Sequence, residues 1–364
     1  MRKRYFALLA ALALLLSLSA PCGADAGRMA LRYADQFSVD YEDDGTALVT
    51  VGETDRFLVV PEGNDARDIP GAVTLRLPLH TIYAASSAAP DPILRLGALD
   101  AVRLTGTKRE DWTLPELRRA MDEGEILYAG KYSAPDYELL LLEGTELAIE
   151  NTMIYHSPET KEQLEALGIP VLVERSSYEA HPLGRLEWIK LYGLLCGKAA
   201  EAEAFFDAQA ALTEAIPAQA GGPSAVCFFI TANGSVNVRR PEDYLAKMIG
   251  LAGGIYALTE EPAPGESARS TMNMQAESFY ASARDADVLL YNAAIDGGMD
   301  TLAELLRKGE WLADFKAVQN GDVWCTEADV FQQSSAISAM IAELNRIFSG
   351  TAEEAELRYF HRLT

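Results

Sequence analysis

The chain has 364 residues, of which 49% are hydrophobic, and its mean hydropathy lies near zero, so it is long enough for two soluble globular domains. Its 54 acidic and 31 basic residues give a formal net charge of −23 at pH 7. A surface this acidic repels phosphate, which argues against nucleic acid as a partner.

The first 26 residues have the three parts of an export signal. Arg2, Lys3 and Arg4 precede an apolar run over 5–18, too short to cross a membrane comfortably, and small residues follow at 24–26. We therefore expect cleavage after residue 26 and an exported chain, in the periplasm or at the outer face of the cytoplasmic membrane. A lipid anchor at Cys22 is the alternative, although the residues before Cys22 match a lipoprotein signal poorly.

Residues 27–72 are predicted to form an N-terminal extension ahead of the main pattern. Strand-like runs at 47–51 and 56–60 flank a polar turn, which predicts a β-hairpin. The segment 61–70 is rich in Gly, Asp and Pro and is typical of a linker.

From residue 73 the sequence alternates between short apolar runs and helical stretches. This alternation predicts a mostly parallel sheet with helices on both faces. We expect an N-terminal α/β lobe over 73–197, with strands at 73–79, 102–105, 126–128, 147–150 and 171–174.

A long helical stretch separates this lobe from a second one. Residues 182–195 have apolar side chains at helical spacing, and 198–216 contain good helix formers without an internal Gly or Pro, up to Pro217. We predict that 198–217 is one long rigid helix, which joins the first lobe to a C-terminal α/β lobe over 218–364 and permits only a small hinge motion. The expected strands of the second lobe are 226–231, 236–238, 288–291 and 323–325.

The same short unit occurs once in each predicted lobe. Glu138 lies early in a helical stretch before the strand at 147–150, and Glu277 holds the matching place before the strand at 288–291. A carboxylate in the first turn of a helix interacts favourably with the helix dipole, which gives both residues a structural explanation. The repetition also provides one acidic group on each lobe for a basic partner.

These features resemble the helix-bridged (class III) substrate-binding proteins of ABC importers for iron complexes, haem and cobalamin. The resemblance covers roughly 73–348 and rests on stretches such as LGALDAVRLTGT, APDYELLLLEGTELAIEN and PLGRLEWIKLYGLLCGKAAEAEAFF. It implies a monomer that captures an iron complex, such as a ferric siderophore, and delivers it to a membrane permease dimer with ATPase subunits. In that family the early glutamates dock on permease arginines, a role that the resemblance assigns here to Glu138 and Glu277.

Candidate ligand-binding residues follow from the strand positions, because ligands of α/β sheets lie beyond the carboxyl ends of strands. The side chains there are aromatic or hydroxyl-bearing and include one basic pair. Such a set suits a bulky, partly apolar anion such as a ferric siderophore, haem or a corrinoid. The candidates are His80, Thr81, Tyr83, Thr152, Tyr155, Ser176, Ser177 and Tyr178 in the first lobe, and Asn237, Arg239, Arg240, Trp324, Phe331 and Gln332 in the second.

Three of the four histidines, His80, His156 and His181, also follow predicted strands of the first lobe. If they converged, they could bind Zn²⁺ or Mn²⁺ directly or ligate haem iron, so a metal- or haem-binding protein is one alternative. A cobalamin-binding protein is another. The sequence contains no nucleophile elbow, phosphate loop or dinucleotide glycine motif, so we expect a binding protein without a catalytic cofactor and not an enzyme.

Overall fold

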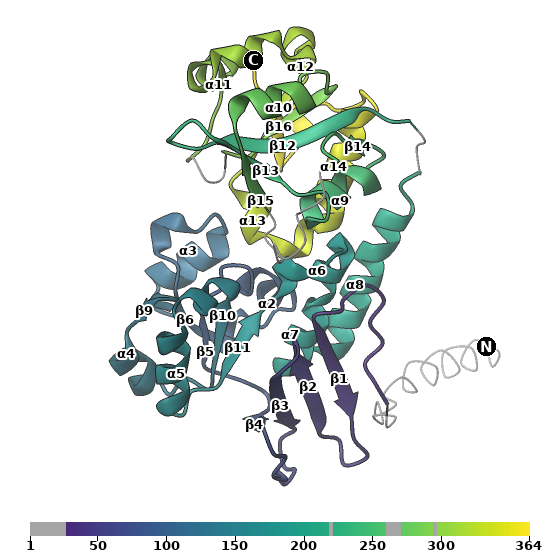
Figure 1. Ribbon diagram of the computed structural model, residues 1–364. Helices are drawn as coiled ribbons and strands as arrows, with labels where there is room; N and C mark the ends of the chain where they lie inside the picture. The colour runs from purple at the N-terminus through teal and green to yellow at the C-terminus, as the bar shows by residue number, and fades with distance from the viewer. Residues whose placement is uncertain (1–26, 218–220, 260–270, 294–296) are drawn as a thin grey trace, which may run out of the picture.

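The computed structural model describes residues 27–217, 221–259, 271–293 and 297–364, and it shows two α/β lobes with a small sheet at the N-terminal end (Figure 1). The predicted export signal and Cys22 lie outside these residues. None of the helices in the described ranges combines the length and the apolar character that a membrane span requires.

The predicted hairpin forms, because residues 47–51 pair antiparallel with 55–60, and it is part of a larger four-stranded sheet. Its strands follow in the order β1 (Phe37–Tyr41), β2 (Ala47–Val51), β3 (Asp55–Val60) and β4 (Ala72–Arg76). β4 pairs in parallel with β3, so the prediction that 73–79 opens the sheet of the first lobe is wrong. An apolar run indicates that a strand forms. Which strand it pairs with depends on contacts with residues that are far away in the sequence.

The first lobe has a parallel sheet in the order β11-β10-β5-β6-β7. β5 is only three residues long and lies at the centre of the sheet. The strands span Val171–Glu174 (β11), Leu147–Asn151 (β10), Ile82–Ala84 (β5), Val102–Thr105 (β6) and Leu127–Tyr128 (β7). They are mostly aliphatic and buried, as the alternation of strands and helices predicted.

Helices cover both faces of this sheet. Ile93 and Leu117 pack on the face that carries Ile82 and Ile149, whereas Leu140 packs with Tyr83 and Ala148 on the other face. The helices that supply these contacts are α2 (Pro90–Arg95), α3 (Pro115–Asp122), α4 (Tyr137–Leu142) and α5 (Pro158–Ala166).

Glu150 is an ionisable residue inside the first lobe. It lies in β10, is fully buried, and neither carboxyl oxygen has a hydrogen-bond partner among the described residues. Burial raises the pKa of this carboxyl to about 8, from an ordinary value of 4.5. Between these pH values the folded protein holds a proton that the unfolded chain has lost. The stability of the protein should therefore fall as the pH rises from about 4.5 to about 8.

Replacing Glu150 by glutamine should remove this part of the pH dependence. We expect Glu150→Gln to match the native protein near pH 5 and to exceed its free energy of unfolding above pH 8 by on the order of a few kcal/mol, because glutamine does not ionise. Urea unfolding at several pH values measures the difference. Glu162→Gln, at an exposed position of α5, is the control and should keep the native profile. Parallel pH profiles for Glu150→Gln and the native protein would rule out this explanation.

Three helices follow the first sheet: α6 (Pro182–Glu187), α7 (Ile189–Leu195) and α8 (Ala199–Glu214). α8 occupies the stretch predicted to bridge the lobes, and it runs along one side of the molecule from the first lobe to the second (Figure 1). Gly193 allows α8 to pack closely on α7, because a Cβ at this glycine would lie 2.4 Å from the Cβ of Ala202. At the other end, the Thr213 hydroxyl donates to Ser338 of the second lobe at 2.9 Å.

The sheet of the second lobe is parallel at its centre and antiparallel towards its edges, in the order β15-β13-β12-β16-β17-β18. Asn233 and Gly234 form the turn between β12 and β13, where Gly234 has a φ of 82° and its N–H donates to the Thr231 carbonyl. The strands are β12 (Ser224–Ile230), β13 (Val236–Arg239), β15 (Thr271–Met274), β16 (Val288–Tyr291), β17 (Val323–Thr326) and β18 (Phe360–Arg362), and β14 (Ile255–Tyr256) also pairs with β12.

A continuous apolar cluster connects the lobes on the α8 side. It includes Leu183 and Leu186 of α6, Phe206 of α8, and Tyr244 and Met340 of the second lobe. Such a shared core limits how far the lobes can separate. The helices of the second lobe are α9 (Tyr244–Leu251), α10 (Ala276–Ala283), α11 (Leu302–Lys308), α12 (Lys316–Asn320), α13 (Asp329–Gln332) and α14 (Ile337–Phe348).

Candidate functional site

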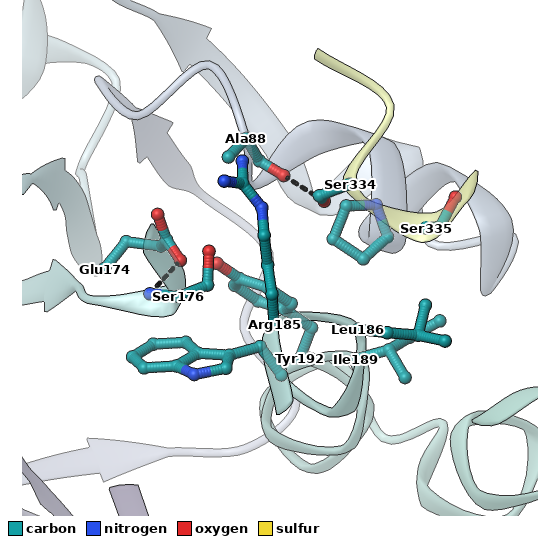
Figure 2. A pocket seen from close by; sticks show the side chains of 11 residues that line it. Ala88, Glu174, Ser176, Arg185, Leu186, Ile189, Tyr192, Ser334 and Ser335 are labelled. Carbon is teal, nitrogen blue, oxygen red and sulfur yellow. Dashed lines mark hydrogen bonds between the residues drawn. The ribbon is translucent and has the colours of Figure 1, made fainter. Parts of the chain in front are cut away.

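A narrow, tightly closed crevice lies where the two lobes meet (Figure 2). Its wall on the first lobe comes from the loop after β5, from α2 and from the end of β11, and α6 and α7 contribute a second wall. Ser334 and Ser335 of the second lobe close it. The lining residues of this interlobe crevice are Ala88, Pro92, Glu174, Ser176, Arg185, Leu186, Trp188, Ile189, Tyr192, Ser334 and Ser335.

Gln332 ties the second lobe to the first beside this crevice. Its side-chain oxygen accepts from the backbone N–H and the hydroxyl of Thr113, at 2.8 and 2.9 Å. Its side-chain nitrogen donates to the carbonyl of Asp111 at 2.7 Å. Both hydrogen-bonding groups of this amide are thus satisfied across the lobe boundary.

Ser334 and Ser335 make further hydrogen bonds between the lobes. The Ser334 hydroxyl donates to the Ala88 carbonyl at 3.0 Å, and the Ser335 backbone N–H donates to Asp91 at 2.7 Å. Asp91 is fully buried in α2, and burial raises the pKa of its carboxyl while the hydrogen bonds from Ser335 oppose that rise. The segment 332–335 therefore holds the lobes together on the side of the crevice away from α8.

Two polar groups of the crevice have no partner among the described residues. The Arg185 side chain, in a residue that is 8% exposed, makes no hydrogen bond or ion pair, although its guanidinium lies 4.5 Å from the centre of the Tyr244 ring. The Tyr192 hydroxyl is buried without a hydrogen bond, and burial raises its pKa well above 10. The crevice thus contains donors that nothing described in the protein satisfies.

The structure moves the first group of predicted ligand residues away from the crevice. Because β5 begins at Ile82, His80 and Thr81 precede this strand, and their backbone N–H groups donate to Glu146. Tyr83 lies inside β5, is fully buried and donates its hydroxyl to the Gly130 carbonyl. The structure thus contradicts the reason for choosing these three residues, since the strand predicted at 73–79 belongs to another sheet and the first lobe's strand begins later, at Ile82.

The residues after β10 and β11 lie at the expected ends of their strands, but only Ser176 lines the crevice. The Tyr155 hydroxyl accepts from Arg175, and the Arg175 guanidinium lies 5.0 Å from the centre of the Tyr178 ring. Thr152 and Ser177 are half-buried in the short helical turns after these strands.

The predicted residues of the second lobe have different surroundings. Trp324 is wrongly predicted as a cleft wall, since it is 1% exposed within the apolar core. Asn237 donates to Asn273 on the neighbouring strand. Arg239 and Arg240 are both buried; Arg239 pairs with Asp243 at 3.5 Å and lies 5.3 Å from the Phe331 ring centre. Gln332 serves the contact between the lobes.

The three histidines do not converge. His181 caps α6, where its Nδ1 accepts from the Leu183 N–H and its ring stacks on Tyr33. His80 is exposed before β5, and His156 is exposed after β10. Within the described ranges, no group of three or more His, Cys, Asp or Glu side chains could hold a metal ion. The direct three-histidine metal site is therefore not formed.

No family model matches the chain. Two uncharacterized lipoproteins of Methanocaldococcus jannaschii are each 24% identical to it. The first match covers 62% of this chain and 53% of the lipoprotein, and the second covers 83% of this chain and 78% of the lipoprotein. The chain thus spans about half the length of the first.

Solved structures give a clearer comparison. A periplasmic haem-binding protein from Pseudomonas aeruginosa matches with a TM-score of 0.61 and 18% identity, over 79% of this chain and 99% of its own. A petrobactin-binding protein from Bacillus subtilis matches with a TM-score of 0.59 and 12% identity, over 86% of this chain and 99% of its own. A catecholate-siderophore binding protein from Vibrio cholerae matches with a TM-score of 0.56 and 13% identity, over 73% of this chain and 93% of its own. The chain has the two-lobed fold of these binding proteins. The resemblance seen in the sequence is thereby confirmed at the level of the fold.

Within this two-lobed fold, the sequence interpretation missed Arg185, Tyr192 and Ser334. Arg185 and Tyr192 lie within helices, so a rule based on strand ends could not select them. Every residue of α6 is buried, Arg185 included, and this burial is seen only in the structure. An arginine on the buried side of a helix requires a partner, and sequence alone does not show that none is present.

Proposed function

We propose that this protein is the substrate-binding component of an ABC importer, which captures an iron complex or a related large chelate between its lobes. The observation that carries the proposal is a crevice lined by both lobes and closed by hydrogen bonds between them. A solute that contacts both lobes favours the closed arrangement, so its binding is coupled to closure. The names of proteins with the same fold, which bind haem, petrobactin and a catecholate siderophore, support the choice of solute.

The closed crevice is small for such a solute. It leaves almost no room even for a water molecule, whereas pockets that hold drug-sized ligands usually enclose about 300–1,000 Å³. We infer that the lobes part at segment 332–335 to admit the chelate. The hydrogen bonds of Gln332, Ser334 and Ser335 would break in this motion, while the apolar cluster beside α8 would act as the hinge.

We assign docking on the permease to Glu138 and Glu277. Each is exposed in the first turn of a helix, α4 or α10, that directly precedes an interior strand of its lobe, β10 or β16. Neither carboxylate has a hydrogen bond or an ion pair with a residue that the structure describes. An exported location agrees with the predicted signal at 1–26 and with the lipoprotein names of the two curated relatives.

Native purification followed by an absorbance spectrum and metal analysis tests this proposal. We expect a coloured protein that contains iron in a chelate, and ferric catecholate, haem and a corrinoid differ in their spectra. If the purified protein is empty, titration with ferric tricatecholate, haem and cobalamin should quench the fluorescence of Trp188, which lines the crevice. A colourless protein that holds bare zinc, or an empty protein that binds none of these compounds, would contradict the proposal.

A further inference from the structure

Arg185 is a buried cation that forms no ion pair with a described carboxylate, although Asp243 is near enough to interact with its charge. A guanidinium stays charged in a protein and carries five N–H donors in a fixed plane. Enclosing such a group without a partner costs free energy, because the protein replaces the water that would otherwise solvate it. In Figure 2 the Arg185 side chain extends from α6 with Glu174 and Ser176 on one side and Ser334 on the other.

The carboxylates near the crevice are bound elsewhere. Glu174 accepts from the Ser176 N–H at 2.8 Å and from the Ser86 hydroxyl at 3.4 Å. Asp243 accepts from the Leu245 N–H at 2.9 Å and pairs with Arg239 at 3.5 Å. Asp243 interacts with the Arg185 charge from a distance, but neither carboxylate forms an ion pair with it, so the N–H donors of the guanidinium remain unused by the described residues.

The Tyr192 hydroxyl provides a second donor in the same place. Tyr192 lies on α7, the helix that follows the one carrying Arg185, and it lines the same crevice. Its hydroxyl has no hydrogen bond with any described residue. Two unsatisfied donors, one of them charged, form a site that an oxyanion would complete.

We propose that Arg185, assisted by the Tyr192 hydroxyl, is the subsite that selects an anionic solute. A carboxylate or the oxygen pair of a catecholate would accept two parallel hydrogen bonds from the guanidinium. This inference rests on the proposed function, because it names the charge class of the chelate that the crevice accepts. It predicts preference for anionic complexes over neutral ones of similar size, although the protein as a whole carries a charge of −23.

Binding of two synthetic complexes tests the charge preference. Ferric tricatecholate is an anion and a ferric trihydroxamate is neutral, and tryptophan fluorescence reports binding of both. Arg185→Met should weaken binding of the tricatecholate by about 30-fold or more and leave the trihydroxamate affinity little changed. Arg185→Lys should lie between, since it keeps the charge and loses the planar fork. Arg119→Met is the matched control, because Arg119 is an exposed arginine of α3 outside the crevice.

A second measurement is independent of iron chelates. Citrate should raise the melting temperature of the native protein and of Arg119→Met above the value in sodium chloride of equal ionic strength, and most of this rise should be lost in Arg185→Met. An equal rise in Arg185→Met, or none in the native protein, would overturn the anion subsite. So would equal losses of both ferric complexes in Arg185→Met, which would indicate a merely structural role. If the native protein binds no complex at all, the proposed function fails, and the citrate measurement still decides the role of Arg185.

Discussion

Replacing Glu138 and Glu277 together by alanine should abolish uptake of the solute and leave its affinity for the isolated protein nearly unchanged. Both carboxylates are exposed and neither lines the interlobe crevice, so we expect their loss to leave the binding surface intact. At an interface with permease arginines, each truncation would leave a desolvated cation without its partner, at a cost of about 2–5 kcal/mol. Two such losses would make the affinity of the binding protein for the permease too weak to support uptake.

Uptake by cells and calorimetry on the purified protein measure the two halves of this prediction. The matched control is Glu159→Ala with Glu310→Ala, which removes one exposed glutamate from each lobe and changes the net charge equally. Uptake should persist in the control. Full transport by the Glu138→Ala, Glu277→Ala protein would disprove the docking assignment, and a loss of solute affinity would show that these residues act inside the binding protein.

Glu187→Ala should destabilise the fold strongly. Glu187 is fully buried in α6, and its carboxylate accepts the backbone N–H groups of Arg32, Tyr33 and Ala34 at 2.8 to 3.0 Å. It also pairs with Lys190, which is itself buried, at 3.0 Å. Truncation leaves three backbone donors and an ammonium without this acceptor. Removing one partner of a buried pair costs about 3–5 kcal/mol, and we expect a loss in this range.

Urea unfolding measures that loss, and limited proteolysis should show early cleavage near residues 30–36, the segment that Glu187 holds. Glu203 supplies the other carboxylate beside Lys190, and its side chain is 51% exposed. Glu203→Ala should therefore lower the free energy of unfolding by no more than about 1 kcal/mol. Adding Lys190→Met to Glu187→Ala should recover part of the stability, since the unpaired charge is then gone. If Glu187→Ala and Glu203→Ala unfold at the same urea concentration, the buried carboxylate does not anchor this segment.

The sequence was sufficient where the signal is local. Apolar runs located β6, β10 and β11, the absence of Gly and Pro over 198–216 indicated α8, and Asn233-Gly234 specified a turn. These features depend on backbone periodicity and turn geometry within a few residues. The repeated early glutamates were also readable, because their place before a strand is a matter of chain order.

The crevice itself was decided by the tertiary structure. Because β4 pairs with β3, the first strand of the first lobe's sheet is β5 and not the run at 73–79. The residues that follow this strand at the crevice are therefore Ser86 and Ala88, and not His80 and Thr81. Trp324 proved to be core, and Gln332 joins the lobes. The amino-acid sequence by itself determined the segments with a strong local pattern, such as β6, β10, β11 and α8, but β1 and β5 were not predicted. Only the folded chain decided which strands pair and which buried charge lacks a partner, because both depend on contacts between residues far apart in sequence.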